Sequence, residues 1–248
     1  MLFLNDRADA VMRRASAAAS EPIYDFDLML GGGHVSGRRI GGSAADSLAA
    51  FIADETGANK LQFAVGDGNH SLAAARKFWL EKRETLDPVR RENDPARYAL
   101  VELVNIHDPA ITFEPIHRVL FHTDSEQFLN AARQALGDPG SDRYITLLAS
   151  GAQVRIPAKG DAIGHLIELS ETFCRNYTDA HGGEIDYIHG DQETITLASQ
   201  KDAAGILLPR MEKEELFSSV EQTGPFPKKS FSIGLGPDKR YYLECRKL

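Results

Sequence analysis

The stretch LQFAVGDGNHSLAAARKFW, residues 61–79, decides how this chain is interpreted. Its first six residues are mostly apolar and fit a strand, and the alanine-rich part after Ser71 is typical of a helix. A strand, a glycine-containing turn and a helix start together direct free backbone N–H groups toward an anion. The turn also carries a carboxylate, an amide, an imidazole and a hydroxyl. We therefore predict a phosphate site formed by Asp67, Gly68, Asn69, His70 and Ser71.

The same turn has a simpler interpretation as a helix cap. Asp67 or Asn69 alone could accept the first helical N–H groups, with Gly68 supplying an unusual backbone angle. Capping requires only one such side chain, whereas this turn places several polar side chains next to one another. The density of polar groups favours a ligand site and leaves the identity of the ligand open.

Composition limits the class of protein. At 248 residues, with 42% hydrophobic and 26% charged residues, the chain fits a soluble globular protein of one large or two small domains. A formal net charge of −8 disfavours a general nucleic-acid binder, because phosphate backbones require a basic surface, but it permits a small phosphorylated ligand. No apolar run reaches membrane-spanning length, and the start lacks a secretory signal. Two cysteines are too few for a disulfide framework, and we expect a cytoplasmic protein without a membrane partner.

Helix and strand patterns alternate irregularly along the chain, without steady β-α-β repetition. This favours an α+β fold with a mixed sheet and helices. We expect helices at 6–19, 43–57, 70–84, 125–136, 163–177, 191–199 and 211–220. Strands are expected at 61–66, 98–106, 116–121, 185–189 and 205–208, with hairpins over 23–40 and 144–156 and a final antiparallel pair of 230–233 with 241–245. The charged stretch 84–97, which contains two prolines, is expected to be a surface loop.

Further polar residues stand at the ends of predicted strands, where pockets are commonly lined. These candidates are His34, His107, Glu114, His117, Arg118, His189 and Asp191. Each also has an ordinary structural interpretation that the sequence leaves open. The three glycines before His34 fit a tight turn, and Asp191 fits a helix N-cap. Arg118 could bind an anionic ligand or form an ion pair with Glu114 or Asp108.

The histidines and carboxylates are numerous enough for a metal site, but none has the spacing of a compact ligand motif. A magnesium ion that accompanies a nucleotide needs only one or two carboxylates besides phosphate oxygens, and Asp67 is the candidate for it. The sequence contains neither a P-loop nor a Gly-x-Ser-x-Gly nucleophile elbow, which excludes those two enzyme classes.

Six segments together resemble one bacterial family. They are Tyr24–Asp27 with Gly31–His34, Phe63–Ser71, Val104–Asp108, Phe113–Arg118, Ile185–Asp191 and Tyr241–Lys247. The family is a domain of unknown function, DUF1015, and the resemblance runs over nearly the whole chain. It implies a core like that of the ParB/sulfiredoxin-like superfamily. Members of this superfamily bind nucleotides or phosphate where a strand, a turn and the start of a helix meet. One of them is an ADP-dependent kinase of free serine.

On this resemblance, Asp67–Ser71 is the phosphate-binding turn. In the phosphotransfer that we expect there, Asp67 and His70 are the catalytic residues: His70 hydrogen-bonds a phosphate oxygen, and Asp67 positions magnesium or accepts the substrate proton. The implied ligands are a nucleotide such as ADP, ATP or CTP, and magnesium. We expect a phosphate-binding core over residues 1–122 and an additional C-terminal α+β portion over residues 123–248 that packs on it. The corresponding turn of the serine kinase has arginine at the position of Ser71. Arg76, Lys77 or Arg118 would therefore have to make the bidentate phosphate contact of that arginine.

The chain also begins inside the usual span of the family, which indicates an N-terminally truncated member. The function that we expect is binding of a small phosphorylated ligand or nucleotide, with small-molecule phosphotransfer of the serine-kinase kind as the reaction. One alternative is a non-catalytic, nucleotide-binding regulatory module. The other is a metal-dependent hydrolase that uses the histidines.

Overall fold

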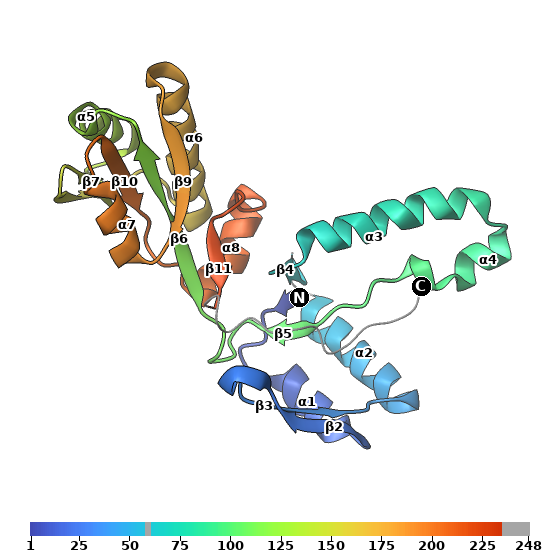
Figure 1. The fold of residues 1–248 in the computed structure, drawn as a ribbon. Coiled ribbons are helices and arrows are strands. Elements are labelled where there is room, and N and C mark those ends of the chain that lie inside the picture. Colours follow the sequence, from blue (N-terminus) through green and yellow to red (C-terminus); the bar gives the residue numbers. More distant parts are fainter. Residues whose placement is uncertain (58–60, 235–248) are drawn as a thin grey trace. The chain divides into compact units, whose positions relative to one another are not determined.

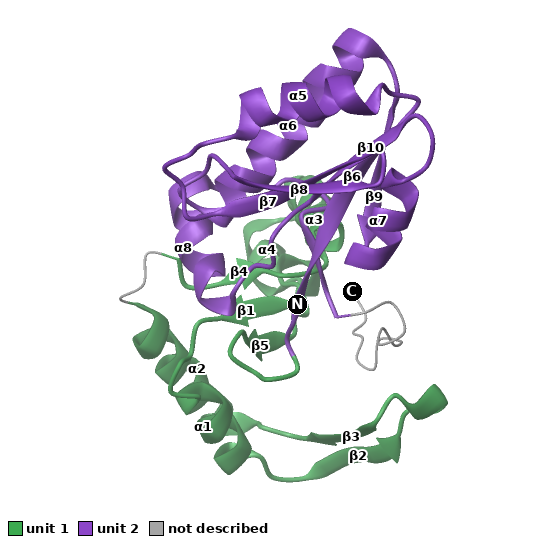
Figure 2. Cartoon of the chain, turned by 90° about the vertical axis from the view of Figure 1, so that its left-hand side faces the viewer, with its two compact units in different colours: residues 1–110, 236–248 green, residues 111–235 purple. Residues whose placement is uncertain are grey.

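The computed structural model describes residues 1–57 and 61–234 (Figure 1). Within them the chain forms two compact units, one from Met1 to Ala110 and one that starts at Ile111 (Figure 2). Both units combine helices with sheets, so the expected α+β class is confirmed. No helix in the described ranges is both long enough and apolar enough to span a membrane.

The first unit contains a small three-stranded sheet with strand β1 (Leu2–Leu4) at its centre. β1 pairs antiparallel with β4 (Ala64–Val65) and parallel with β5 (Leu103–Asn105). The side chains of Phe3 and Leu4 are fully buried beside this sheet. The predicted strand at 61–66 is therefore present in shortened form, and it lies next to the first residues of the chain.

A separate hairpin confirms the prediction for residues 23–40. Strands β2 (Pro22–Asp27) and β3 (His34–Arg38) pair antiparallel across a turn with the short 3-10 helix η1 (Met29–Gly31). Helix α1 (Ala10–Ala18) begins where the Asp6 carboxylate accepts the N–H groups of its first two residues, at 3.0 and 2.8 Å. Helix α2 (Gly42–Gly57) contacts α1.

The stretch after the predicted phosphate turn is more helical than expected. Helix α3 (Asn69–Lys82) is followed by the 3-10 helix η2 (Arg83–Thr85), helix α4 (Pro88–Asn93) and the 3-10 helix η3 (Pro95–Arg97). The prediction of a loop at 84–97 was therefore wrong. Asp87 caps α4 by accepting N–H bonds from Val89 and Arg90, and proline at the first helical position favours the helix instead of breaking it.

The buried strand predicted over 98–106 was also wrong in most of its length. Only Leu103–Asn105 forms a strand, and Tyr98, Leu100 and Val101 are 57%, 54% and 45% exposed. An apolar run indicates burial only when a partner surface covers it, and that partner is not encoded in the run itself.

The second unit is built on a six-stranded sheet whose pairings are all antiparallel. Its long central strand is β6 (Phe113–Phe121). β11 (Phe231–Ile233) and β9 (Glu184–His189) pair with successive parts of β6, and β10 (Ala203–Leu207) also pairs with it. The sheet continues from β10 through the hairpin of β7 (Tyr144–Ala149) and β8 (Ala152–Pro157).

Helices flank both faces of this sheet (Figure 1). Helix α7 (Asp191–Ala198) packs on the face that carries Val119 and Leu148. Helix α6 (Ile163–His181) contacts α5 (Ser125–Leu136) and α8 (Lys213–Thr223). The predicted helices at 125–136, 163–177, 191–199 and 211–220 and the hairpin at 144–156 are confirmed. The predicted strand at 241–245 lies outside the described residues.

Burial makes the single described cysteine, Cys174 on α6, an unreactive thiol. Burial raises the pKa of Cys174 to about 12, and the neighbouring Glu171 carboxylate acts in the same direction. The thiolate is the reactive form of cysteine. In a Cys245→Ser variant at pH 8, we therefore expect no thiol to react with Ellman's reagent in the native protein and one to react after unfolding. Fast labelling of the native variant would contradict this.

Candidate functional site

The predicted phosphate turn joins β4 to α3 and rests on the core of the first unit. The N–H of Gly66 donates to the carbonyl of Met1 at 3.2 Å, and the backbone nitrogen of Met1 donates to the carbonyl of Asp67 at 3.1 Å. A Cβ atom at Gly66 would lie 2.3 Å from Cε2 of the buried Phe3 ring. Only glycine therefore allows the backbone to pass this closely over Phe3.

Gly68 turns the chain into the helix. Its φ of 83° lies in the left-handed region, and it occupies the N-cap position of α3. The Asp67 carboxylate accepts the N–H of Gly68 at 2.7 Å, and the first helical bond runs from Leu72 N–H to the Gly68 carbonyl at 2.9 Å. No side chain caps this helix, so the interpretation of Asp67 or Asn69 as the N-cap was wrong.

The consequence is an open helix mouth. Within the described residues, the N–H groups of Asn69, His70 and Ser71 have no hydrogen-bond acceptor. The side chains of Asp67, Asn69, His70 and Ser71 are all exposed, so solvent and ligands can reach them. The helix dipole adds positive potential at the same point. Chemically, this arrangement can bind an oxyanion through backbone N–H groups and orient it with an imidazole and a hydroxyl.

The two other candidates in the first unit have protein partners. His34 lies on the hairpin, where its two ring nitrogens are 2.9 Å from Asp25 Oδ1 and 2.8 Å from Asp27 Oδ1. Nε2 of His107 lies 2.7 Å from Oδ1 of Asn5. Both histidines therefore hold local structure in place in this conformation.

The turn contains one candidate ligand for magnesium, the carboxylate of Asp67. In residues 1–57 and 61–234, no group of three or more His, Cys, Asp or Glu side chains is placed to hold a metal ion. Because magnesium usually keeps several waters and binds through one or two carboxylates plus phosphate oxygens, Asp67 fits it only together with a phosphorylated ligand.

In the second unit, the structure joins His117 to Asp191. Nε2 of His117 lies 2.9 Å from Oδ1 of Asp191, the first residue of α7, and Nδ1 accepts the N–H of Leu208 at 3.1 Å. Because Nδ1 accepts a backbone N–H, the ring proton is on Nε2, which donates it to Asp191. Burial lowers the pKa of His117, and the Asp191 carboxylate opposes this only in part. A buried neutral histidine thus orients an exposed carboxylate.

Arg118, the next residue along β6, faces the opposite side of the sheet and is fully buried. Its Nε and Nη2 atoms each donate to Oε2 of Glu171 on α6 at 3.3 Å. Its ion-pair partner is therefore neither Asp108 nor Glu114, and Glu114 pairs instead with Arg210 at 3.2 Å. His189 is exposed at the end of β9, opposite Ile116. Alternation along a strand thus separates His117 from Arg118.

Sequence reasoning missed Glu171, Arg175, Tyr187 and Lys229 as members of a charged cluster. Tyr187 donates its hydroxyl to Oε1 of Glu171 at 2.7 Å, and Nε of Arg175 donates to the same atom at 2.7 Å. The one available signal was the Glu171–Arg175 spacing of four residues, which is typical of a helical ion pair.

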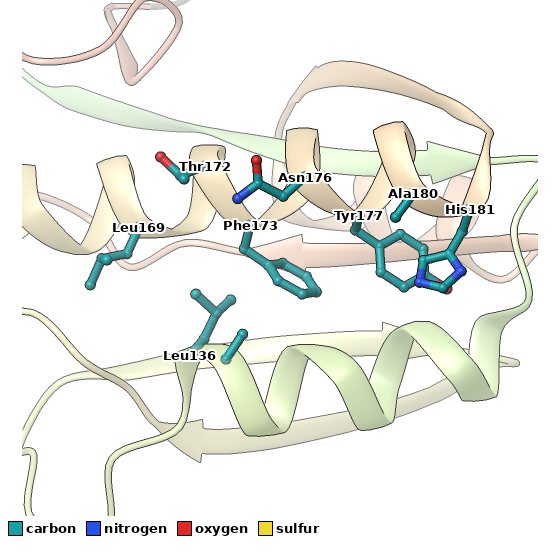
Figure 3. A pocket seen from close by; sticks show the side chains of 9 residues that line it. Leu136, Leu169, Thr172, Phe173, Asn176, Tyr177, Ala180 and His181 are labelled. Carbon is teal, nitrogen blue, oxygen red and sulfur yellow. The ribbon is translucent and has the colours of Figure 1, made fainter.

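A groove between α5 and α6 is a further concave feature (Figure 3). Its cavity volume is about 390 Å³, and its lining is mainly apolar. Phe173 and Tyr177 extend from α6 toward α5, and the centroid of the His181 ring lies 4.6 Å from that of Tyr177. None of the residues proposed from the sequence lines this groove.

The chain belongs to DUF1015, a family of proteins of unknown function, which it matches over residues 1–246. Among curated proteins none matches it. Similar solved structures include a conserved hypothetical protein from Pyrococcus furiosus, at 12% identity and a TM-score of 0.45, covering 77% of this chain and 84% of that one.

Two further similar structures are of a free serine kinase. A mutant in complex with ADP has 12% identity and a TM-score of 0.48, with 77% of this chain and 81% of that one covered. A second mutant, in complex with AMP, has 14% identity and a TM-score of 0.46, with the same coverage.

Proposed function

We propose that this protein binds the phosphate group of a small molecule or nucleotide at the mouth of α3. The observation that carries the proposal is the uncapped first turn of that helix, with Gly68 in a left-handed conformation and exposed polar side chains on both sides of it. Phosphate oxygens would accept the N–H groups of Asn69, His70 and Ser71. The Ser71 hydroxyl and the His70 imidazole would add side-chain hydrogen bonds.

The reaction that this arrangement fits is phosphoryl transfer, because that chemistry depends mainly on positioning and on neutralisation of charge. Asp67 is exposed and lies one residue before the N-cap. In the proposed reaction its carboxylate accepts the proton of an acceptor hydroxyl or takes part in holding magnesium. A magnesium ion bound together with the ligand would neutralise phosphate charge.

Binding is tested by isothermal titration of ADP, ATP, CTP and inorganic phosphate, with and without magnesium. We expect one of these to bind, and we expect His70→Ala to weaken its binding by about tenfold or more, since a hydrogen bond to a charged group contributes about 1.5–3 kcal/mol. Asp67→Ala is expected to weaken magnesium-dependent binding. Asp54→Ala, on the exposed surface of α2, is the control and should leave affinity unchanged.

If none of the four ligands binds, or if Asp67→Ala and His70→Ala bind as the unchanged protein does, the proposal fails. A second measurement separates an enzyme from a binding module. Turnover of nucleotide with serine or another hydroxyl compound supports a phosphotransferase. Binding without turnover supports a non-catalytic nucleotide-binding module.

A further inference from the structure

We propose that the second unit has an anion site of its own, in which Lys229 and Arg175 bind a phosphate or carboxylate group beside Tyr187. This site involves none of the residues at the mouth of α3, so it is independent of the function proposed above. Its floor is the part of β6 around Arg118, where β9 pairs with that strand, next to the start of β6, where β11 pairs with it (Figure 1).

Two cationic side chains meet at one aromatic ring. The guanidinium carbon of Arg118 lies 5.3 Å from the ring centroid of Tyr187, and Nζ of Lys229 lies 5.1 Å from the same centroid. Both distances are within the range of a cation–π interaction. Arg175 is connected to this ring through Glu171, which accepts hydrogen bonds from both Arg175 and Tyr187.

The charges of this cluster do not balance. Arg118, Arg175 and Lys229 carry three positive charges, and within the described chain Glu171 is the only carboxylate that forms an ion pair with any of them. One carboxylate therefore serves two guanidinium groups, and the ammonium of Lys229 adds to the excess. The chain as a whole has a formal net charge of −8, so this local excess of positive charge runs against its general character.

The buried member of the cluster has unused donors. A guanidinium has five N–H groups. Arg118 is fully buried, and its bonds go to Glu171 through Nε and Nη2 and to the Ile116 carbonyl through Nη1. Two of its five N–H groups therefore have no acceptor among the described residues. Buried donors without a protein partner commonly indicate a water molecule or an ion that completes them.

The backbone of Lys229 is held in a costly conformation. Its φ is 57°, in the left-handed region, which disfavours a residue with a side chain by about 1–2 kcal/mol. Residues kept in such conformations often have a functional side chain. Here the conformation coincides with placement of the ammonium at the Tyr187 ring, whereas the neighbouring Lys228 has no contact with that ring among the described residues.

These groups define the ligand as an oxyanion. The Arg175 side chain is 66% exposed and Lys229 is exposed, so both can reach a bound molecule. A guanidinium fork and an ammonium together match the oxygens of a phosphate or carboxylate. Burial raises the pKa of Tyr187, and its hydrogen bond to Glu171 raises it further, so the phenol stays neutral and does not repel an anion.

The test uses Lys229→Gly in the full chain, titrated with inorganic phosphate and separately with acetate at constant ionic strength. Glycine accepts a φ of 57° without strain, so the variant is expected to be at least as stable as the unchanged protein. We expect its affinity for the preferred anion to fall about tenfold, because a charged hydrogen bond is lost. Lys228→Gly removes one positive charge from the residue just before Lys229 and should change affinity by less than about twofold.

Amide chemical shifts of the labelled protein distinguish this site from the mouth of α3. Addition of phosphate or acetate should shift the amides of Tyr187 and Ser230, and Lys229→Gly should abolish these shifts without affecting any shifts at Asn69–Ser71. Equal weakening by Lys228→Gly and Lys229→Gly would overturn the proposal, since it would indicate a diffuse charge effect. An absence of anion-dependent shifts at Tyr187 and Ser230 would overturn it as well.

Discussion

Replacing Glu171 by alanine is expected to lower the free energy of unfolding of the second unit by about 3–5 kcal/mol, the usual effect of removing one partner of a buried ion pair. Glu171 is 7% exposed, and Arg118, which it neutralises, is fully buried. The substitution leaves the buried Arg118 guanidinium without its carboxylate partner. It also removes the acceptor of Tyr187 and Arg175.

Urea unfolding followed by circular dichroism measures this loss. Glu168→Ala, one turn earlier on the exposed surface of α6, is the matched control, and we expect it to change stability by no more than about 0.5 kcal/mol. The double variant Arg118→Met/Glu171→Leu removes both charges and should recover most of the stability, since apolar replacement of a whole buried pair is often neutral. A Glu171→Ala variant as stable as Glu168→Ala would contradict the buried pair.

The same pair predicts how stability depends on pH. Burial acts to raise the pKa of Glu171, but the hydrogen bonds from Tyr187 and Arg175 and the charges of Arg118 and Arg175 outweigh it, and the net pKa is lowered. A carboxyl whose pKa is lower in the folded state stabilises the fold above its unfolded value, near 4.5, and this contribution is lost as pH falls through the folded value. Glu171→Gln should therefore show a weaker loss of stability than the unchanged protein as pH falls below about 4.5.

Local signals explain which elements the sequence predicts correctly. Helix α5 has the predicted bounds because Asp124 caps it and because Phe128, Ala132 and Leu136 form one buried stripe at helical spacing. The helix in the predicted loop was missed although Asp87 and Pro88 are strong start signals, because two prolines and many charges also fit a loop. Tyr98–Val101 shows the opposite error. Its apolar residues predict a buried strand, but Tyr98, Leu100 and Val101 are exposed.

The same distinction between local signals and long-range contacts applies to the candidate site. The helix mouth at Asn69 could be predicted because the strand, the glycine turn and the helix are adjacent in the chain. Partners that meet only through the tertiary packing of distant segments could not be predicted. Leu208 reaches His117 from 91 positions away, and Glu171 reaches Arg118 from 53 positions away. The first pair depends on the register between β10 and β6, and the second depends on how α6 packs against the sheet; a single sequence specifies neither.

The second large effect is expected at Gly66, where alanine should lower the affinity of the α3 turn for its phosphate ligand by more than about tenfold. The added Cβ would lie 2.3 Å from the Phe3 ring, far inside contact distance, and Phe3 is fully buried and cannot swing away. Overpacking of this kind costs about 1–3 kcal/mol. If residues 66–68 move to relieve this strain, the N–H groups of Asn69–Ser71 will no longer point at the anion.

A second substitution tests whether that contact is the cause. Phe3→Leu makes the buried side chain smaller, so Gly66→Ala/Phe3→Leu should bind phosphate ligand more tightly than Gly66→Ala alone. The gain identifies steric displacement of the turn, because Phe3→Leu by itself removes core packing and should not improve binding. Titration of all three variants with the ligand that binds the unchanged protein measures this coupling. If Gly66→Ala binds normally, the close approach of the turn to Phe3 does not position the helix mouth, and the geometric basis of the proposed phosphate site is lost.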